Sequence, residues 1–442
     1  MKPINAGLLG IGTVGGGTFT VLRRNAEEIA RRAGRPIRIT VVADKNLELA
    51  RQMTEGRGQR TEEVRLTDDA FSVVADPEVD IVIELIGGCG VAKDLVLKAI
   101  ANGKHVVTAN KALLAMHGNE IFKAAQDKGV TVAFEAAVAG GIPIIKALRE
   151  GLSANRIQWI AGIINGTTNF ILSEMRDKGL SFDTVLKEAQ RLGYAEADPT
   201  FDIEGVDAAH KITILSALAF GIPMQFDKAY IEGISKLDAT DIKYAEQLGY
   251  RIKLLGITKR TPEGVELRVH PTLIPAKRLI ANVEGAMNAV LVQGDAVGST
   301  LYYGKGAGAE PTASAVIADL VDVTRMHTAD PEHRVPHLAF QPDQLADLPI
   351  LPMNEVTTSY YLRLCVQDKP GVLADITRIL AGEQISIDAV IQKEPAEGEE
   401  QTDLIMLTHQ TREKRINAAI AKIEALPVVA GKVTRLRLEQ LG

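Results

Sequence analysis

The first third of the chain alternates short apolar runs with longer stretches in which apolar residues recur every three or four positions. The short runs are rich in β-branched residues and are typical of buried strands, whereas the longer stretches are typical of amphipathic helices. The predicted strands are residues 4–9, 38–43, 79–86, 105–108 and 130–134. This alternation predicts a Rossmann-type, parallel α/β sheet over residues 1–135, with ligands at the carboxyl ends of its strands.

From residue 136 the pattern changes to mixed helix and strand. The segment 212–222 is apolar almost all round, which predicts a buried helix. The runs 256–258 and 265–269 look like adjacent strands of a second sheet. Residues 136–325 are therefore expected to form an α+β domain that binds substrate and contributes to dimerisation.

A proline-rich stretch over residues 326–353 precedes the C-terminal region. Its histidines, His327, His333 and His337, are better explained by a linker than by a metal cluster. Residues 354–442 follow the order strand, helix, strand, strand, helix, strand, which predicts a separate ferredoxin-like domain.

Composition narrows the classes of function. The net charge of −6 offers no basic footprint for nucleic acid. No apolar run approaches the roughly 18 residues that a membrane span needs, and the N-terminus does not resemble a secretory signal. Only Cys89 and Cys365 are present, which disfavours a disulfide scaffold or a zinc cluster. The chain is expected to be cytoplasmic.

The turn after the first strand has the spacing G-x-G-x-x-G and leads into a helix. In this context the glycines allow a tight turn, close approach of the backbone to phosphates and close packing of helix on strand. A dinucleotide site is therefore predicted, with a plain strand-to-helix turn as the alternative. Its residues are Gly10, Ile11, Gly12, Thr13, Val14 and Gly15.

The second predicted strand ends in Asp44 and Lys45. A carboxylate at this point can accept hydrogen bonds from the adenosine ribose of NAD, and a neighbouring lysine can pair with the 2′-phosphate of NADP. The sequence does not choose between NAD and NADP, and a role of Asp44 as an ordinary turn residue is the alternative to both.

Lys111 follows the strand 105–108 at the carboxyl edge of the predicted sheet. That position places it beside the nicotinamide end of the cleft. A solvated surface lysine is the alternative.

Carboxylates crowd the segment before the buried helix. Glu196, Asp198 and Asp202 precede it, and Asp207 and Lys211 stand four residues apart on one face of it. A partly buried acid–lysine pair can hold the lysine ready for proton transfer. A surface ion pair explains the spacing equally well.

Several of these motifs, taken in order, resemble the signature of homoserine dehydrogenases, and the resemblance covers residues 4 to about 325. The motifs are Asn110-Lys111-Ala112-Leu113-Leu114, the turn from Gly162 to Thr167, Ala189 with Gly193, Asp198-Pro199 with Asp202, Gly205, Asp207 and Lys211, and Gly304-Lys305-Gly306-Ala307-Gly308 with Pro311-Thr312. The resemblance implies reversible, NAD(P)-dependent interconversion of L-aspartate 4-semialdehyde and L-homoserine, on the route to threonine, methionine and isoleucine.

The resemblance also implies roles for individual residues. Lys211 would give a proton to the carbonyl oxygen on reduction, Lys111 would lie near the carbonyl and the nicotinamide, and Asp207 would orient the lysine. Two converging lysines would tend to lower each other's pKa. Glu196, Asp202, Gly193 and Thr167 would bind substrate, and Gly306 would belong to a segment, near 304–325, that returns to the cofactor.

A sodium ion is a further implication of the resemblance. It would lie on Glu135, Val138, Gly140 and Ile142, through backbone carbonyl groups. Oxygen ligands of this kind suit a hard cation.

The C-terminal region resembles an ACT domain, with the motif Asp368-Lys369-Pro370-Gly371-Val372-Leu373. Such a module binds amino acids at paired subunits, so the resemblance implies an amino-acid effector, for which threonine is expected, and a homodimer or homotetramer. A chain cut after Met353 is expected to stay folded and active. A pure dimerisation role remains the alternative.

Two other classes of protein are considered. A sensor would bind dinucleotide and amino acid without turnover, and the set of Lys111, Glu196, Asp207 and Lys211 argues against it. Another oxidoreductase of the same domain type, such as aspartate dehydrogenase or a semialdehyde dehydrogenase, is the second. A semialdehyde dehydrogenase needs a cysteine nucleophile, and Cys89 lacks a partnering histidine motif.

Overall fold

The computed structural model describes residues 2–55, 64–330, 334–393, 395 and 400–442. His333, together with residues 394 and 396–399 of the predicted C-terminal domain, lies outside the described residues. The chain divides into two compact units. The first comprises Met1–Gly166, Asp207–Ala229 and Met287–Leu348, and the second comprises Thr167–Val206, Tyr230–Ala286 and Pro349–Gly442.

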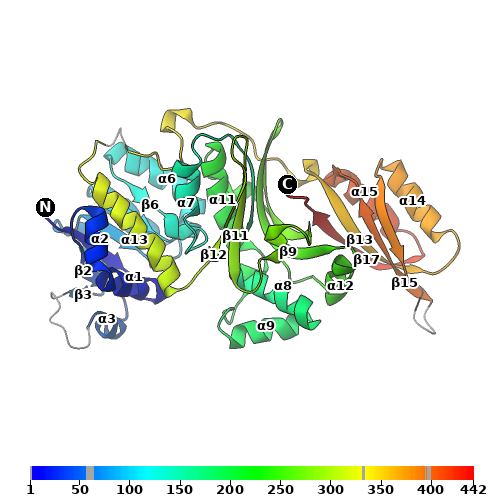
Figure 1. The fold of residues 1–442 in the computed structure, drawn as a ribbon, viewed down its shortest axis with the longest axis horizontal. Helices are drawn as coiled ribbons and strands as arrows, with labels where there is room; N and C mark the ends of the chain where they lie inside the picture. The colour runs from blue at the N-terminus through cyan, green and yellow to red at the C-terminus, as the bar shows by residue number, and fades with distance from the viewer. Residues whose placement is uncertain (1, 56–63, 331–333, 394, 396–399) are drawn as a thin grey trace. The chain divides into compact units, whose positions relative to one another are not determined.

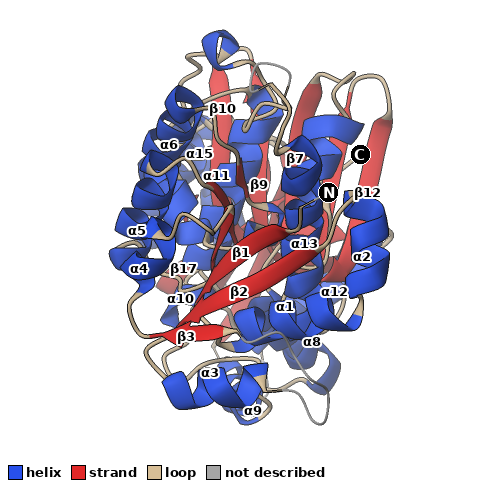
Figure 2. Ribbon diagram, turned by 90° about the vertical axis from the view of Figure 1, so that its left-hand side faces the viewer, coloured by secondary structure: helices blue, strands red, loops and turns tan. Residues whose placement is uncertain are grey.

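The N-terminal part of the first unit is a six-stranded parallel sheet in the order β3-β2-β1-β4-β5-β6. Figure 2 shows β1, β2 and β3 side by side. This is the strand order of dinucleotide-binding folds, so the predicted Rossmann-type sheet is confirmed. The three-residue β3 was not predicted. The strands are β1 (Ile4–Leu9), β2 (Ile37–Ala43), β3 (Arg65–Thr67), β4 (Ile81–Glu84), β5 (His105–Thr108) and β6 (Val132–Ala133).

Helices connect these strands, and apolar side chains from both fill the space between them. The central strands β1 and β4 are almost completely buried, as strands covered on both faces must be. The connecting helices are α1 (Thr13–Arg24), α2 (Ala26–Ala33), α3 (Leu47–Thr54), α4 (Ala70–Ala75), α5 (Val91–Ala101) and α6 (Lys111–Lys128).

A late segment of the chain returns to this domain as α13 (Ala309–Met326). The helix packs so closely on α1 that a Cβ atom added to Gly17 would lie 2.5 Å from the carbonyl oxygen of Ala309. Figure 1 shows α13 next to α1 and α2. The first unit also holds an antiparallel set of strands in the order β12-β11-β7, formed by β7 (Ile157–Ile163), β11 (Met287–Gly294) and β12 (Gly298–Lys305).

The buried helix predicted over 212–222 is part of α11 (Val206–Phe220), and every residue from Asp207 to Phe220 is buried. It begins where the positive backbone angle of Gly205 (φ 83°) ends the short helix α10 (Thr200–Ile203). A glycine suits this position because left-handed backbone is costly for other residues.

The second unit contains the long antiparallel pair β9 (Tyr250–Thr261) and β10 (Gly264–Pro275), in which Ile257 lies opposite Arg268. The adjacent strands predicted at 256–258 and 265–269 are therefore confirmed. The other elements of this region are α8 (Gly166–Lys178), α9 (Phe182–Arg191), β8 (Tyr230–Ile231) and α12 (Ala239–Gln247).

The C-terminal module has the predicted βαββαβ order, with a short extra strand, β16 (Thr411–Arg412). Its sheet runs β17-β13-β15-β14, and side chains from both helices fill its core. Its elements are β13 (Thr357–Gln367), α14 (Val372–Gly382), β14 (Ile387–Gln392), β15 (Gln401–Thr408), α15 (Glu413–Glu424) and β17 (Val429–Leu438).

One contact of this module was not foreseen. Strand β17 pairs in parallel with β10, with Thr272 opposite Arg437 and Leu273 opposite Leu438. The module and the β9–β10 pair therefore share one sheet within the second unit. No helix in the described residues has the length and apolarity to cross a bilayer.

Candidate active site

The glycine turn has the geometry that a dinucleotide loop needs. Gly10 adopts φ 91°, and a Cβ atom on Gly15 would lie 2.0 Å from the Gly10 carbonyl oxygen, so both positions require glycine. A Cβ on Gly12 would meet nothing within 4 Å. The space beside Gly12 is therefore open, which is where phosphates approach the backbone in such loops.

Asp44 is tied to this turn. Its carboxylate accepts hydrogen bonds from the backbone N–H of Ile11 at 2.7 Å and of Asn46 at 2.8 Å. Lys45 is exposed, and its Nζ donates to the carbonyl of Asp68 at 3.3 Å. Both side chains lie at the carboxyl end of β2, and Asp44 also fixes the shape of the glycine turn.

Lys111 begins helix α6. The Asn110 side chain caps this helix by accepting from the N–H of Leu113 at 3.1 Å, and its amide donates to the carbonyl of Gly88 at 2.7 Å. The cap connects the loops after β4 and β5, at the carboxyl edge where the sequence predicted Lys111.

Two lysines share one carboxylate. The Nζ of Lys211 lies 2.6 Å from one oxygen of Asp207, and the Nζ of Lys111 lies 3.1 Å from the other. Asp207 and Lys211 occupy neighbouring turns of α11, which is the i,i+4 face expected from their spacing. The pair is buried and not a surface ion pair: the side chains of Asp207 and Lys211 are 5% and 11% exposed, whereas Lys111 is 36% exposed.

The turn after β7 holds this group in place. The Asn165 side chain donates to Asp207 at 2.9 Å, and Lys211 donates to the carbonyl of Ile164 at 2.8 Å. Asn165 was not among the predicted site residues, although it lies within the Gly162–Thr167 motif that carried the resemblance.

Electrostatics keeps Asp207 ionised. Burial alone would raise the pKa of its carboxyl, but the ammonium groups of Lys211 and Lys111 outweigh burial and hold that pKa well below its ordinary value. The neighbouring His210 adds no charge near neutral pH, because burial lowers its pKa to about 4. The imidazole of His210 instead packs on Phe226, with ring centroids 4.3 Å apart.

The predicted substrate residues belong to the second unit. Thr167 donates to the carbonyl of Tyr194 at 2.6 Å, and Gln190 donates to the carbonyl of Glu196 at 3.1 Å. Gly193 turns the chain with φ 77°. The carboxylate of Glu196 is exposed and Asp202 is half-buried at the end of α10.

The turn predicted to hold sodium packs on the segment that contains Gly306. The N–H of Gly141 donates to the carbonyl of Lys305 at 2.9 Å, and a Cβ on Gly140 would lie 2.6 Å from the Gly306 carbonyl oxygen. The side chain of Glu135 accepts from the N–H groups of Ile145 and Lys146, both at 2.9 Å. The cation turn and the return segment are therefore neighbours within the first unit.

Comparison with known families and proteins agrees with this geometry. Residues 10–135 match the family profile "Homoserine dehydrogenase, NAD binding domain", residues 143–321 match "Homoserine dehydrogenase", and residues 360–428 match "ACT domain". The homoserine dehydrogenase of Pseudomonas aeruginosa is 64% identical over 442 residues, the full length of both chains. The chain belongs to the homoserine dehydrogenase family.

Solved structures of homoserine dehydrogenases agree with this assignment. The protein from Thiobacillus denitrificans has a TM-score of 0.95 at 73% identity and covers 100% of this chain and 99% of its own. The Staphylococcus aureus protein at pH 7.5 has a TM-score of 0.74 at 33% identity, with 99% of each chain covered. A hyperthermophilic archaeal homoserine dehydrogenase in complex with NADPH has a TM-score of 0.62 at 26% identity and covers 74% of this chain and 99% of its own.

As a homoserine dehydrogenase, the chain is an oxidoreductase that interconverts L-aspartate 4-semialdehyde and L-homoserine with NAD(P), in the biosynthesis of threonine and methionine. Its N-terminal domain is the NAD(P)-binding domain, and its C-terminal module is an ACT domain. The protein is therefore neither a sensor without turnover nor an aspartate dehydrogenase or semialdehyde dehydrogenase.

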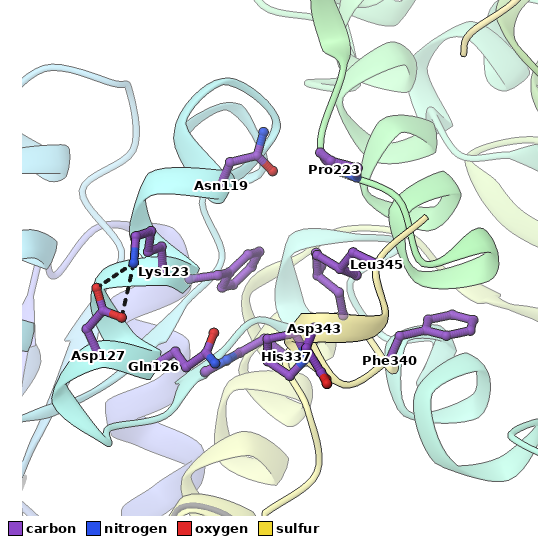
Figure 3. A pocket seen from close by; sticks show the side chains of 12 residues that line it. Asn119, Lys123, Gln126, Asp127, Pro223, His337, Phe340, Asp343 and Leu345 are labelled. Carbon is purple, nitrogen blue, oxygen red and sulfur yellow. Dashed lines mark hydrogen bonds and ion pairs between the residues drawn. The ribbon is translucent and has the colours of Figure 1, made fainter. Parts of the chain in front are cut away.

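A pocket of about 440 Å³ in the first unit of this homoserine dehydrogenase is lined by neither Lys111 nor Lys211. The segment after α13 packs on α6, where His337 stacks on Phe122 with centroids 5.3 Å apart. Figure 3 shows that His337, Phe340 and Leu345 line it from this segment, opposite side chains of α6. Since Lys111, Asp207 and Lys211 are not among its lining residues, this pocket is not the catalytic cleft.

Proposed function

We propose that Lys211 is the general acid that protonates the carbonyl oxygen of L-aspartate 4-semialdehyde during reduction and the general base in the reverse direction. The contact between Lys211 and the buried carboxylate of Asp207 carries this proposal. A buried ammonium donor fixed within hydrogen-bond reach of a carboxylate is oriented for one proton transfer.

Lys111 approaches the same carboxylate from α6, from the edge of the sheet where the nicotinamide lies in this fold. Its greater exposure suits a group that meets substrate. Asp207 compensates the charges of both lysines, so they can converge on one carbonyl group without strong mutual repulsion. Asn165 positions the carboxylate and is added to the site.

NAD(P)H, when bound, supplies the hydride. The chain's own residues would hold it: the turn from Gly10 to Gly15 leaves open space beside Gly12 for the pyrophosphate, Asp44 and Lys45 would meet the adenosine ribose, and Gly306 belongs to the return segment. Because Asp44 already accepts two backbone hydrogen bonds and Lys45 is exposed, we propose that the site takes NADP as well as NAD.

Glu196, Asp202, Gly193 and Thr167 are proposed to bind the amino-acid portion of the substrate. The exposed carboxylate of Glu196 suits its ammonium group. The hydroxyl group of Thr167 and the left-handed Gly193 hold the loop between α9 and α10 in shape.

The residues of the turn 135–142 fit a sodium ion. The positive backbone angles of Ala139 and Gly140 reverse the chain, and main-chain carbonyl oxygens are the donors that a hard monovalent cation takes. The Glu135 side chain is engaged with the N–H groups of Ile145 and Lys146, so its main-chain carbonyl would be the ligand. Sodium would stabilise the turn that packs on Gly306.

The ACT module is proposed to bind threonine and to regulate turnover in a homodimer or homotetramer. In the turn before α14, Asp368 accepts from Gln392 at 3.0 Å, and Gly371 adopts φ 96°. This turn offers a carboxylate and backbone donors for the two charged ends of an amino acid.

The proposed function is tested by following NADH and NADPH absorbance with L-aspartate 4-semialdehyde and with L-homoserine. Oxidation of the reduced coenzyme by the semialdehyde, and reduction of the oxidised coenzyme by homoserine, are expected. Absence of both reactions above background would contradict it. The same assay with threonine tests the effector.

A further inference from the structure

The C-terminal module places a buried arginine against the substrate region of the second unit. Arg437 on β17 is completely buried, and its guanidinium donates to Glu232 at 2.8 Å and to Glu413. Glu413 belongs to the module, whereas Glu232 follows β8 in the substrate region. Arg437 therefore connects the two parts by a charged contact in a low-dielectric environment.

Tyr230 reinforces the contact. Its hydroxyl donates to Glu232 at 2.6 Å and accepts from Arg437 at 3.0 Å, and the arginine lies over the Tyr230 ring at 4.8 Å. Burial alone would raise the pKa of Glu232, but Arg437 outweighs it and holds that pKa below its ordinary value. Glu232 is thus fixed from two sides.

The residues after Glu232 hold the end of α10. The N–H of Ile234 donates to the carbonyl of Ile203 at 2.8 Å. A Cβ on Gly233 would lie 2.3 Å from the same carbonyl oxygen and 2.4 Å from the Cα of Glu204. Because Ile203 directly follows Asp202, these contacts place the segment after Glu232 against the residue next to the proposed substrate carboxylate.

We propose that Glu232 and Arg437 are positioning residues for substrate binding, so that the C-terminal module holds the Asp202 segment in place through this ion pair. The inference rests on the proposed role of Asp202 and adds that the module contributes to substrate affinity even without an effector. Since hydrogen-bonded backbone continues from Glu232 to α10, loosening the ion pair loosens α10.

The variant Glu232→Gln removes the charge and keeps the side-chain shape, and it leaves Arg437 paired with Glu413. The matched control is Glu439→Gln. Glu439 lies in the C-terminal module and bonds Arg268 of β10 at 2.7 Å. This variant also removes one charged contact between the module and the rest of the second unit, but Arg268 keeps Glu266 and Glu232 keeps Arg437. Tyr230→Phe is a milder second variant that removes only the bridging hydroxyl.

Two measurements are made on the full chain. The first is hydrogen exchange of peptides that cover residues 196–206, which needs no substrate, and the second is KM against kcat for L-aspartate 4-semialdehyde. Glu232→Gln should speed exchange in this segment and raise KM by on the order of 5- to 150-fold, the usual range of coupling between sites. The value of kcat should stay within about threefold, as when uniform binding is lost.

Tyr230→Phe should change exchange and KM in the same direction but less, and Glu439→Gln should change neither. Unchanged exchange in Glu232→Gln, equal changes in the control, or faster exchange with an unchanged KM would each overturn the proposal. If Glu232→Gln fails to fold, Tyr230→Phe decides by the same criteria. A wild-type chain without turnover would instead contradict the proposed function, while exchange would still test the positioning.

Discussion

Lys211 donates to Asp207 across one turn of α11, with 2.6 Å between Nζ and the carboxylate oxygen, in a helix that is buried on every side. A charge pair in such a place is costly to desolvate and contributes little net stability. The proposed chemistry gives this costly pair a reason: the carboxylate would orient the proposed proton donor within a buried helix.

Asp207→Asn should impair turnover more than substrate affinity. The variant removes the charge that offsets Lys111 and Lys211 and leaves two buried or half-buried ammonium groups without it, so we expect kcat to fall by roughly 10²-fold, at the lower end for acid–base groups. Steady-state kinetics with NADPH checks this. The control is Glu28→Gln, which breaks only exposed pairs with Arg31 and Arg32 and should leave kcat unchanged. An unaltered kcat in Asp207→Asn would reduce the pair to a structural feature.

Two variants of the glycine turn should affect stability and coenzyme binding differently. Gly12→Ala adds a methyl group where the protein leaves space, so its melting temperature should match wild type while the Kd for NADPH rises by at least about tenfold. Gly15→Ala places Cβ against the Gly10 carbonyl and should lower the melting temperature. Fluorescence titration and thermal unfolding measure both. Tight NADPH binding by Gly12→Ala would contradict the assigned pyrophosphate position.

Stability should depend on pH through Glu135. Burial, followed by the nearby Asp319, raises its pKa to about 7 from an ordinary value of 4.5. A carboxyl whose pKa is raised by folding binds more protons in the folded state than in the unfolded state. Its contribution to the free energy of unfolding is therefore present below about pH 4.5 and is lost as pH rises towards about 7. The melting temperature of Glu135→Gln should consequently fall less over this window than that of wild type.

For Glu135→Gln the readout is the slope of melting temperature against pH. The absolute melting temperature will also change, because the amide cannot accept hydrogen bonds from both N–H groups in the way that the carboxylate does. Asp319 titrates near the same window, with a pKa raised to about 6 chiefly by burial, so some slope should persist in the variant. Parallel curves for the two proteins would show that Glu135 does not titrate there.

Removal of residues after Met353 should destabilise the rest of the chain, contrary to the expectation from sequence that a truncated chain stays folded. Asp241 of α12 is 1% exposed, and its carboxylate is held by Arg363 at 2.6 Å and Tyr361 at 2.9 Å, both in the ACT module. Loss of the partners of a buried charge typically costs about 3–5 kcal/mol, and β10 would lose its pairing with β17. Urea unfolding of the truncated and full chains tests this. An equal free energy of unfolding for the two chains would show instead that the ACT module can be removed without destabilising the rest.

The local patterns of the sequence were enough to predict the parallel sheet, the apolar helix α11 and the order of the ACT elements. These patterns reflect the spacing of apolar residues, which depends only on residues close together in the sequence. The pairing of β17 with β10 joins residues far apart in sequence, and no spacing indicates it. The same applies to Asn165, whose role depends on a turn that folds back onto α11, and to Arg437, which reads as one more charged residue on an alternating strand.

The spacing of residues in the sequence could not assign the proposed catalytic group, and the fold brings its members together. The i,i+4 spacing of Asp207 and Lys211 left a surface pair and a catalytic pair equally open, and burial in α11 removes the surface alternative. The third member of the group, Lys111, lies on α6, 96 positions before Asp207 in the sequence. Only the fold brings it to the same carboxylate.

The most direct test of the central claim compares Lys211→Ala with wild type in the reduction of L-aspartate 4-semialdehyde, together with the Kd for NADPH. Loss of a general acid should lower kcat by roughly 10²–10⁴-fold, and Kd should stay unchanged because Lys211 belongs to α11 and not to the glycine turn proposed to hold NADPH. If the variant kept more than about a tenth of wild-type kcat, well outside that range, Lys211 would not be the proton donor.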